Sequence, residues 1–243
     1  MRRGALLLAT VVVAASAQSA PTAVGRRCAA IAPPSGAGAT IAKVVVAANV
    51  LSEPGTGKRL WRAATSTPWG DNPTWLLVLG CAVDGSGNRW LRVALPIRPN
   101  GATGWIRSDF TLLDRTDYRL EISTKRADVS VYRKGTLIRH VSAVVGAAGT
   151  PSPHGLFAIY DPVLQPSPDD FVGPWVIHLT AHSDVLDDFG GGPGRVAIHG
   201  RSGASLRDPL GSARSHGCIR VDNDVVSWLA RTIPQGTPVI IRR

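Results

Sequence analysis

The chain of 243 residues is long enough for one large or two small domains. Its formal net charge of +10 favours anionic partners, and nucleic acid is the usual first interpretation of such a balance. The N-terminus argues against nucleic acid, because it predicts export. Residues 1–17 combine the basic pair Arg2 and Arg3 with an apolar run over 5–15 and a small-residue pattern typical of a signal-peptide cleavage site.

The apolar run is well short of the roughly 20 residues that span a bilayer, so we expect cleavage rather than a transmembrane anchor. Removal of residues 1–17 leaves a net charge of +8, because this segment contains no acidic residue. In the periplasm or cell wall such a charge favours anionic wall material. A general solubility charge is the alternative interpretation.

Two segments of different composition follow the predicted signal peptide. Residues 18–39 are rich in Ala, Pro, Gly and Ser and indicate a linker. Residues 40–114 contain short apolar runs separated by turn residues, which predicts a small β-barrel. Through Trp90-x-x-Val93 and Gly104-Trp105-Ile106, this barrel resembles the bacterial Src-homology-3-like wall-associated domains. It contains no catalytic motif, so we expect it to serve in binding or spacing.

The chain has three cysteines, Cys28, Cys81 and Cys218, and an odd number leaves one thiol unpaired in an exported protein. A disulfide between Cys28 and Cys81 would stabilise the N-terminal part by about 4 kcal/mol in the loop-entropy model. Cys218 would then be the free thiol. A buried free Cys81 with Cys28 in a disordered segment is the alternative.

Residues 117–243 predict a second β-rich unit. Tyr118, Leu120 and Ile122 alternate with polar residues, as in a half-buried strand. Further strand-like runs occupy 129–132, 136–138, 141–146, 156–160, 175–177, 196–199 and 238–241. One helix is expected after Asp222 or Asn223, either of which can cap it. The fold class is therefore mainly β, a β-sandwich with one or two helices behind the smaller barrel.

The segment Ser215-His216-Gly217-Cys218 joins a thiol to a histidine and a glycine. If it runs on as an extended strand, the side chains of His216, Cys218 and Arg220 share one face, because side chains alternate with period two. Cationic neighbours favour the thiolate form of a cysteine. Gly217 permits a backbone turn, and the backbone N–H groups there could form an oxyanion hole.

A second histidine, His199, lies upstream with fifteen residues between it and Ser215. With this spacing, residues 196–221 resemble the signature of the L,D-transpeptidases, the YkuD-type catalytic domain, in which a His precedes Ser/Thr-His-Gly-Cys. Pro151-Ser152-Pro153-His154-Gly155 resembles an upstream element of that family. The resemblance covers roughly residues 117–243.

The resemblance implies a role for each site residue. Cys218 would be the nucleophile and His199 its proton acceptor and donor. The Gly200 carbonyl would orient His199, and Arg220 could pair with a substrate carboxylate. The oxyanion site would be shaped by Ser215, His216 and Gly217.

Other patterns indicate no chemistry of their own. His178 and His182 have metal-ligand spacing, but Leu179 stands where a zinc protease needs Glu, so we expect a structural or cleft-lining role. The glycine-rich run 190–194 is not followed by the Lys-Ser/Thr of a phosphate loop. The sequence implies neither a metal nor an organic cofactor.

The expected function is that of an exported cysteine acyltransferase that acts on peptidoglycan stem peptides and cross-links them. Two alternatives remain open. The protein could be a wall-binding module with an inactive catalytic domain, or it could hydrolyse its acyl-enzyme as an L,D-carboxypeptidase.

Overall fold

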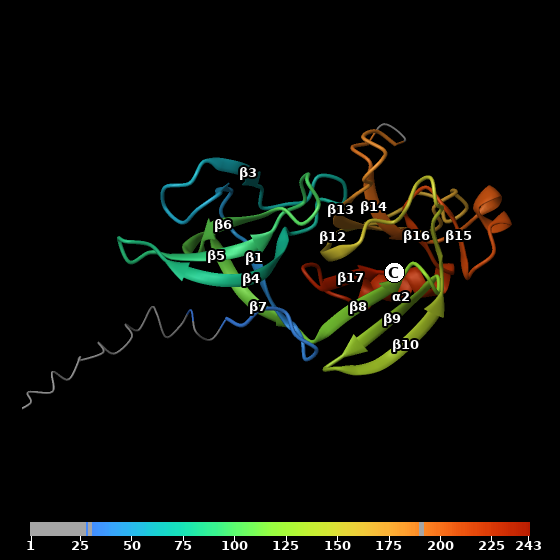
Figure 1. The fold of residues 1–243 in the computed structure, drawn as a ribbon, viewed down its shortest axis with the longest axis horizontal. Helices are drawn as coiled ribbons and strands as arrows, with labels where there is room; N and C mark the ends of the chain where they lie inside the picture. Colours follow the sequence, from blue (N-terminus) through green and yellow to red (C-terminus); the bar gives the residue numbers. More distant parts are fainter. Residues whose placement is uncertain (1–27, 29–30, 190–191) are drawn as a thin grey trace, which may run out of the picture.

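The computed structural model describes residues 28, 31–189 and 192–243. The predicted signal peptide, 1–17, and the first part of the predicted linker, 18–39, lie outside the described residues. The described strands form two sheets that follow one another along the chain (Figure 1). The predicted fold class, mainly β, is confirmed. Within the described residues no helix is both long and apolar enough to cross a membrane.

The N-terminal sheet has the strand order β3-β2-β6-β5-β4-β1-β7. Its elements are β1 (Ala39–Val44), β2 (Ala48–Leu51), β3 (Arg59–Ala63), β4 (Trp75–Val83), β5 (Arg89–Ala94), β6 (Thr103–Arg107), the short helix η1 (Ser108–Phe110) and β7 (Thr111–Thr116). Apolar side chains from these strands, such as Val50, Leu91 and Ile106, are fully buried in one cluster. The resemblance to Src-homology-3-like domains stays a prediction.

A disulfide joins Cys28, ahead of the first strand, to Cys81 in β4, with the two Cα atoms 5.3 Å apart. It closes a loop with a sequence separation of 53, which constrains the unfolded chain and stabilises the fold by about 4 kcal/mol in the loop-entropy model. Cys218 is the free cysteine of the structure.

The C-terminal sheet has the order β10-β9-β8-β17-β12-β13-β14-β16-β11-β15. Its strands are β8 (Tyr118–Ser123), β9 (Asp128–Arg133), β10 (Thr136–Ser142), β11 (Val144–Gly146), β12 (Gly155–Leu164), β13 (Trp175–His182), β14 (Arg195–His199), β15 (Ser212–Ser215), β16 (Ile219–Arg220) and β17 (Pro238–Arg242). The first half of β12 pairs with β17 and the second half with β13. Because β12 changes partners along its length, the two halves of the sheet enclose one core.

The helix α2 (Asn223–Thr232) begins where the sequence predicts a cap, with Asp222 at the N-cap position. Val225, Val226 and Leu229 are spaced for one face of a helix, and all three are buried in the same core as the strands. The short helix η2 (Gly203–Arg207) lies between β14 and β15. These elements hold the loop that follows His199.

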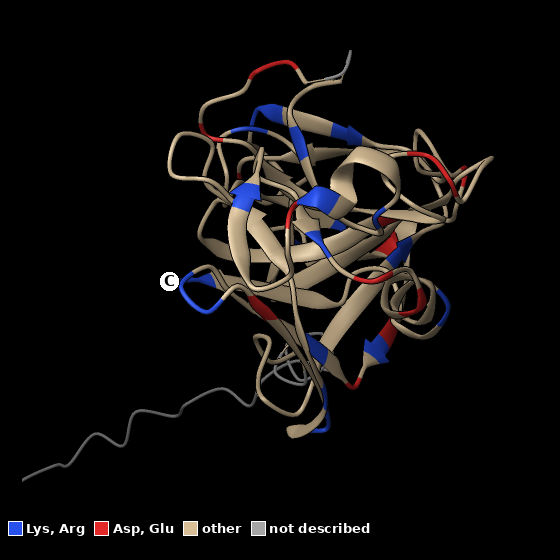
Figure 2. Ribbon diagram, turned by 90° about the vertical axis from the view of Figure 1, so that its right-hand side faces the viewer, with Lys and Arg blue, Asp and Glu red and all other residues tan. Residues whose placement is uncertain are grey.

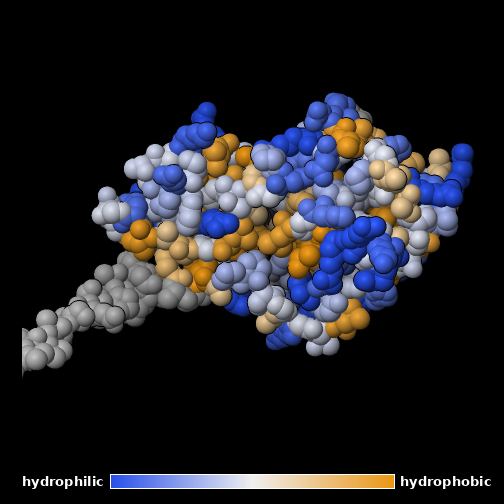
Figure 3. All heavy atoms as spheres, in the orientation of Figure 1, coloured by the Kyte–Doolittle hydropathy of each residue, from blue (hydrophilic) through white to orange (hydrophobic). Residues whose placement is uncertain are grey.

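The two sheets touch along their junction. Ala39, Leu77 and Ala94 of the N-terminal sheet form a small apolar cluster with Ala158 of β12. In Figure 3, apolar residues are visible where the two lobes meet. Thr116 and Thr237 add a buried hydrogen bond of 2.9 Å between their hydroxyl groups.

Candidate active site

Cys218 lies in a tight turn between β15 and β16. Gly217 has φ +110°, a left-handed conformation that glycine adopts without steric cost. The prediction of one extended strand from Ser215 onward is therefore wrong for 216–218, since the chain reverses at the glycine. His216 is exposed, whereas Arg220 is buried.

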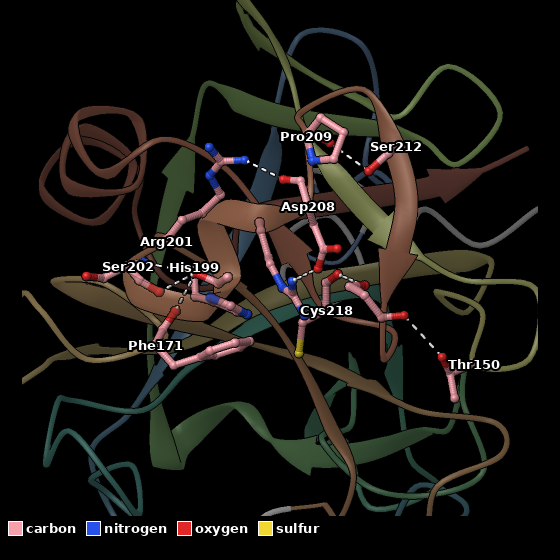
Figure 4. A network of polar contacts seen from close by, with 12 residues as sticks. Thr150, Phe171, His199, Arg201, Ser202, Asp208, Pro209, Ser212 and Cys218 are labelled. Atoms are coloured by element: carbon pink, nitrogen blue, oxygen red, sulfur yellow. Dashed lines mark hydrogen bonds and ion pairs between the residues drawn. The ribbon is translucent and has the colours of Figure 1, made fainter.

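Hydrogen bonds from Ser215 hold this turn. The Ser215 hydroxyl donates to the Cys218 carbonyl at 2.5 Å and accepts the Gly217 N–H at 3.2 Å. The Ser215 carbonyl accepts a bond of 3.1 Å from the Thr150 hydroxyl (Figure 4). Because the Gly217 N–H already has a partner, the amides of His216 and Cys218 are the better candidates for an oxyanion hole.

Ser152 supports the turn from the proline-rich segment before β12. Its hydroxyl donates to the Gly217 carbonyl at 2.8 Å and accepts the Gly146 N–H at 3.0 Å. Ser152 is 2% exposed. The sequence showed a turn here but gave no sign that its hydroxyl reaches the thiol-bearing loop. His154 in the same segment is exposed and bonds to Thr124 at 3.0 Å, outside this network.

His199 is brought beside this turn by the sheet. It is the last residue of β14, which runs parallel to β16 with His199 opposite Arg220. The ring Nδ1 donates to the Gly200 carbonyl at 2.8 Å, as the family resemblance implies. Figure 4 shows the imidazole pointing toward the side on which the Cys218 sulfur lies.

Gly200 is required by its surroundings. A Cβ there would lie 2.2 Å from the Asn223 side-chain oxygen. That oxygen, at the start of α2, accepts the Arg201 N–H at 2.8 Å. The helix thus fixes the loop that supplies the carbonyl partner of His199.

Burial disfavours the charged forms of the imidazole and the thiol. It lowers the pKa of His199 to about 4, against hydrogen bonds with the backbone of Gly200 and Val172 that raise it. Burial also raises the pKa of the Cys218 thiol, although the Ala197 backbone and Arg220 act in the opposite direction. Arg220 thus favours the thiolate, as expected, but the expected net lowering of the thiol pKa is wrong, because loss of solvation outweighs this charge.

Arg220 is 4% exposed and forms an ion pair of 2.7 Å with Asp208, a residue that the sequence did not single out. Its guanidinium also lies 4.9 Å over the ring of Phe171. In the structure the carboxylate partner of Arg220 therefore belongs to this chain. These contacts hold Arg220, two residues after Cys218, in a fixed position.

The two other histidines of interest lie on β13. His182 is 3% exposed, and His178 is partly buried in the lining of a cleft. Burial lowers the pKa of each to about 4. Among the residues that the structure describes, no group of three or more His, Cys, Asp or Glu could hold a metal ion.

Comparison with known proteins places this site in a family. The model of the L,D-transpeptidase catalytic domain, YkuD, matches residues 117–241, and the chain belongs to this family. A curated relative is the putative L,D-transpeptidase YkuD of Bacillus licheniformis. It is 30% identical over 128 residues, which are 53% of this chain and 67% of the relative.

Solved structures of L,D-transpeptidases are also similar. One from Mycobacterium smegmatis has 18% identity and a TM-score of 0.41, over 81% of this chain and 98% of that one. One from Mycobacterium tuberculosis has 13% identity and a TM-score of 0.43, over 83% of this chain and 100% of that one. A mutant enzyme from Enterococcus faecium has 20% identity and a TM-score of 0.39, over 51% of this chain and 49% of that one, about half its length.

Proposed function

We propose that this protein is a peptidoglycan L,D-transpeptidase in which Cys218 is the nucleophile. The observation that carries the proposal is the free Cys218 thiol on a braced turn, beside a buried His199 held by the Gly200 carbonyl. A nucleophile, a base and a group that orients the base are the parts that acyl transfer needs. Family membership supports the same reaction.

The first half-reaction begins from the neutral pair. As the Cys218 sulfur attacks the carbonyl between an L-centre and the terminal D-amino acid of a stem peptide, His199 accepts the thiol proton. The carbon–sulfur bond forms, and the His216 and Cys218 amides stabilise the negative charge on the oxygen. The carbon–nitrogen bond then breaks. His199 returns the proton to the leaving amine, which frees the D-amino acid.

The second half-reaction transfers the acyl group. An amine of a neighbouring stem attacks the thioester, His199 takes a proton from it, and the thiol is restored as the new amide forms. Water in place of the amine gives hydrolysis, the L,D-carboxypeptidase outcome. Splitting the exchange through a thioester replaces one difficult step by two easier ones.

Location outside the cytoplasm is part of the proposal. It is supported by the family's substrate, peptidoglycan stem peptides, and by the signal-peptide pattern of residues 1–17. Figure 2 shows Lys and Arg at positions spread over many strands and loops. Such a distribution favours weak attraction to anionic wall material over one defined electrostatic site.

The test is Cys218→Ala with a defined stem tetrapeptide. We expect the wild type to release the terminal D-amino acid and to gain the mass of one acyl group on Cys218, and the variant to do neither. Release that persists in the variant would refute the proposal. Mass spectrometry of the products then separates cross-linked dimer from hydrolysed tripeptide. An unreactive Cys218 with retained binding to sacculi would favour the inactive wall-binding alternative.

A further inference from the structure

One aromatic residue of the N-terminal sheet lies against the catalytic unit. Trp69 belongs to the loop between β3 and β4, which is closed by a bridge between Ser66 and Pro73. Despite its contacts, Trp69 remains 44% exposed. An exposed indole held in place is a feature that binding sites use, because it offers a large rigid surface at little entropic cost.

A buried carboxylate fixes this loop. Asp161 of β12 is 0% exposed and accepts the Thr67 hydroxyl at 2.8 Å and the N–H groups of Trp69 and Gly70 at 3.1 Å each. The Asn72 amide adds a bond of 3.0 Å to the same carboxylate. Four donors satisfy the charge that burial would otherwise penalise.

The indole then forms one wall of a cleft on the catalytic unit. The cleft has a volume of about 550 Å³, and its walls include Trp69, Val163, Val172, Val176, His178 and Phe189. The rings of Trp69 and His178 lie 4.5 Å apart, and the Arg195 guanidinium lies 5.2 Å from the indole. We call this space the Trp69 cleft. Its volume falls in the range typical of small-ligand sites.

Residues that line the Trp69 cleft lie next to residues of the proposed active site. Val176 is directly opposite His199 in the pairing of β13 with β14, so the two side chains share one face of the sheet. The backbone of Val172 lies close enough to His199 to raise the pKa of its imidazole. On the other side, the ring of Phe189 lies 5.4 Å from that of His216. The walls of the cleft therefore contact both histidines of the site.

From this continuity we propose that the Trp69 cleft binds the stem peptide of the acyl donor, with the indole of the N-terminal sheet as one wall. The inference rests on the proposed function. The donor takes part in both half-reactions, first as peptide and then as thioester, so a preformed space whose walls adjoin His199 and His216 serves it throughout. Valine and aromatic walls suit the amide planes and aliphatic side chains of an extended peptide.

This assignment changes the expected role of the N-terminal sheet. Binding or spacing alone would leave turnover of a soluble peptide independent of residues 40–114. A wall contributed by Trp69 instead makes the N-terminal sheet part of the substrate site.

The experiment measures acylation of Cys218 by mass spectrometry at varied concentrations of a soluble donor tetrapeptide, without an acceptor amine. We expect Trp69→Ala to raise the half-saturating donor concentration about tenfold, while the maximal acylation rate stays within about twofold. Trp69→Phe should restore part of the affinity. Leu112→Ala, at an exposed apolar position on β7 of the same sheet, is the control and should match the wild type.

Two results would overturn the inference. The first is an unchanged half-saturating donor concentration in Trp69→Ala. The second is that, when an acceptor amine is added, only the half-saturating concentration of that amine changes. If no stem peptide acylates Cys218 of the wild type, the proposed function is refuted instead. In that case, calorimetric titration of the donor peptide into the wild type and Trp69→Ala tests the cleft alone. If the peptide binds the variant more weakly than the wild type, the assignment of the cleft is supported. If it binds both proteins equally, or does not bind the wild type at all, the assignment is refuted.

Discussion

The proposed active site (the thiol end) and the Trp69 loop (the indole end) are built in different ways. At the thiol end, a glycine turn and the hydroxyl groups of Ser215 and Ser152 hold Cys218. At the indole end, Trp69 is held by Asp161, which lies 92 positions away in the sequence. The thiol and the imidazole are thus specified mainly by a short motif, whereas the position of the indole depends on contact between two sheets.

The two ends also differ in how they accommodate buried charge. Asp208 is neutralised by the guanidinium of Arg220, a pair of opposite charges at 2.7 Å. Asp161 is satisfied by neutral donors from a loop. Loss of Asp208 leaves the buried Arg220 guanidinium without a partner, whereas loss of Asp161 releases the loop that carries Trp69. Mutations at the two carboxylates should therefore separate stability from substrate binding.

The largest expected effect distinguishes the two histidines at the thiol end. His199→Ala should lower the maximal acylation rate by about 10²–10⁴-fold, because the attacking thiol loses its proton acceptor. His216→Ala should cost about tenfold or less, since its exposed ring only borders the site. Single-turnover mass spectrometry measures both rates. An equal or larger loss in His216→Ala would make the adjacent histidine the base.

The next effect concerns the ion pair. Asp208→Asn should lower the free energy of unfolding by about 3 kcal/mol, because it leaves the buried Arg220 guanidinium unpaired. Asp187→Asn is the matched control, since the Asp187 side chain is 99% exposed and its 3.7 Å pair with Arg98 is screened by solvent. Urea unfolding monitored by tryptophan fluorescence gives both values. If both variants lose a similar free energy of unfolding, burial of the Arg220 pair is not what makes it important.

A smaller effect is expected at the indole end. Asp161→Ala should raise the half-saturating donor concentration about as much as Trp69→Ala, up to about tenfold, because the loop that carries the indole loses its acceptor. Asp84→Ala is the control, because Asp84 organises another loop of the same sheet through Ser86, Asn88 and Trp90. It should change stability without changing donor affinity. Acylation titrations and urea unfolding of both variants check this.

The smallest effect is the pH dependence of Cys218 alkylation by iodoacetamide. Because burial raises the thiol pKa, the reactive thiolate fraction should be small at pH 7 and should still increase as the pH passes 9. A preformed thiolate–imidazolium pair would instead give a rate that is already high and flat between pH 6 and 8. The lowered pKa of His199, about 4, means that its charge does not change within that window.

Several features of the fold and site could be predicted from residues alone. The mainly β class followed from alternation such as Leu120 and Ile122, because one buried face imposes period two on a strand. The helix after Asp222 followed from its cap and apolar spacing. The bond between His199 and the Gly200 carbonyl involves adjacent residues and was implied by the family resemblance.

Other features depended on contacts that no local pattern encodes. The prediction that residues 215–221 form one extended strand was wrong, because alternation of side chains cannot show that Gly217 adopts a positive φ. The thiolate prediction did not hold either, since the sequence names the charged neighbours of Cys218 but not its burial. Thr150 and Ser152 gave no catalytic signal, because their hydroxyl groups act on backbone carbonyls 65 positions away. Asp208 gave none because its effect depends on the burial of the Arg220 side chain that it pairs with.

The sequence by itself determined the reactive groups, their order along the chain and the family to which they belong. Tertiary structure alone decided which charges are paired, which groups are buried and which distant loop packs against the catalytic unit. The physical reason is that thiol and imidazole chemistry reside in the residue types, whereas solvation and long-range hydrogen bonding depend on what the folded chain packs around them. Trp69 and Asp161 are the clearest case, since neither position indicates a functional role until the two sheets meet.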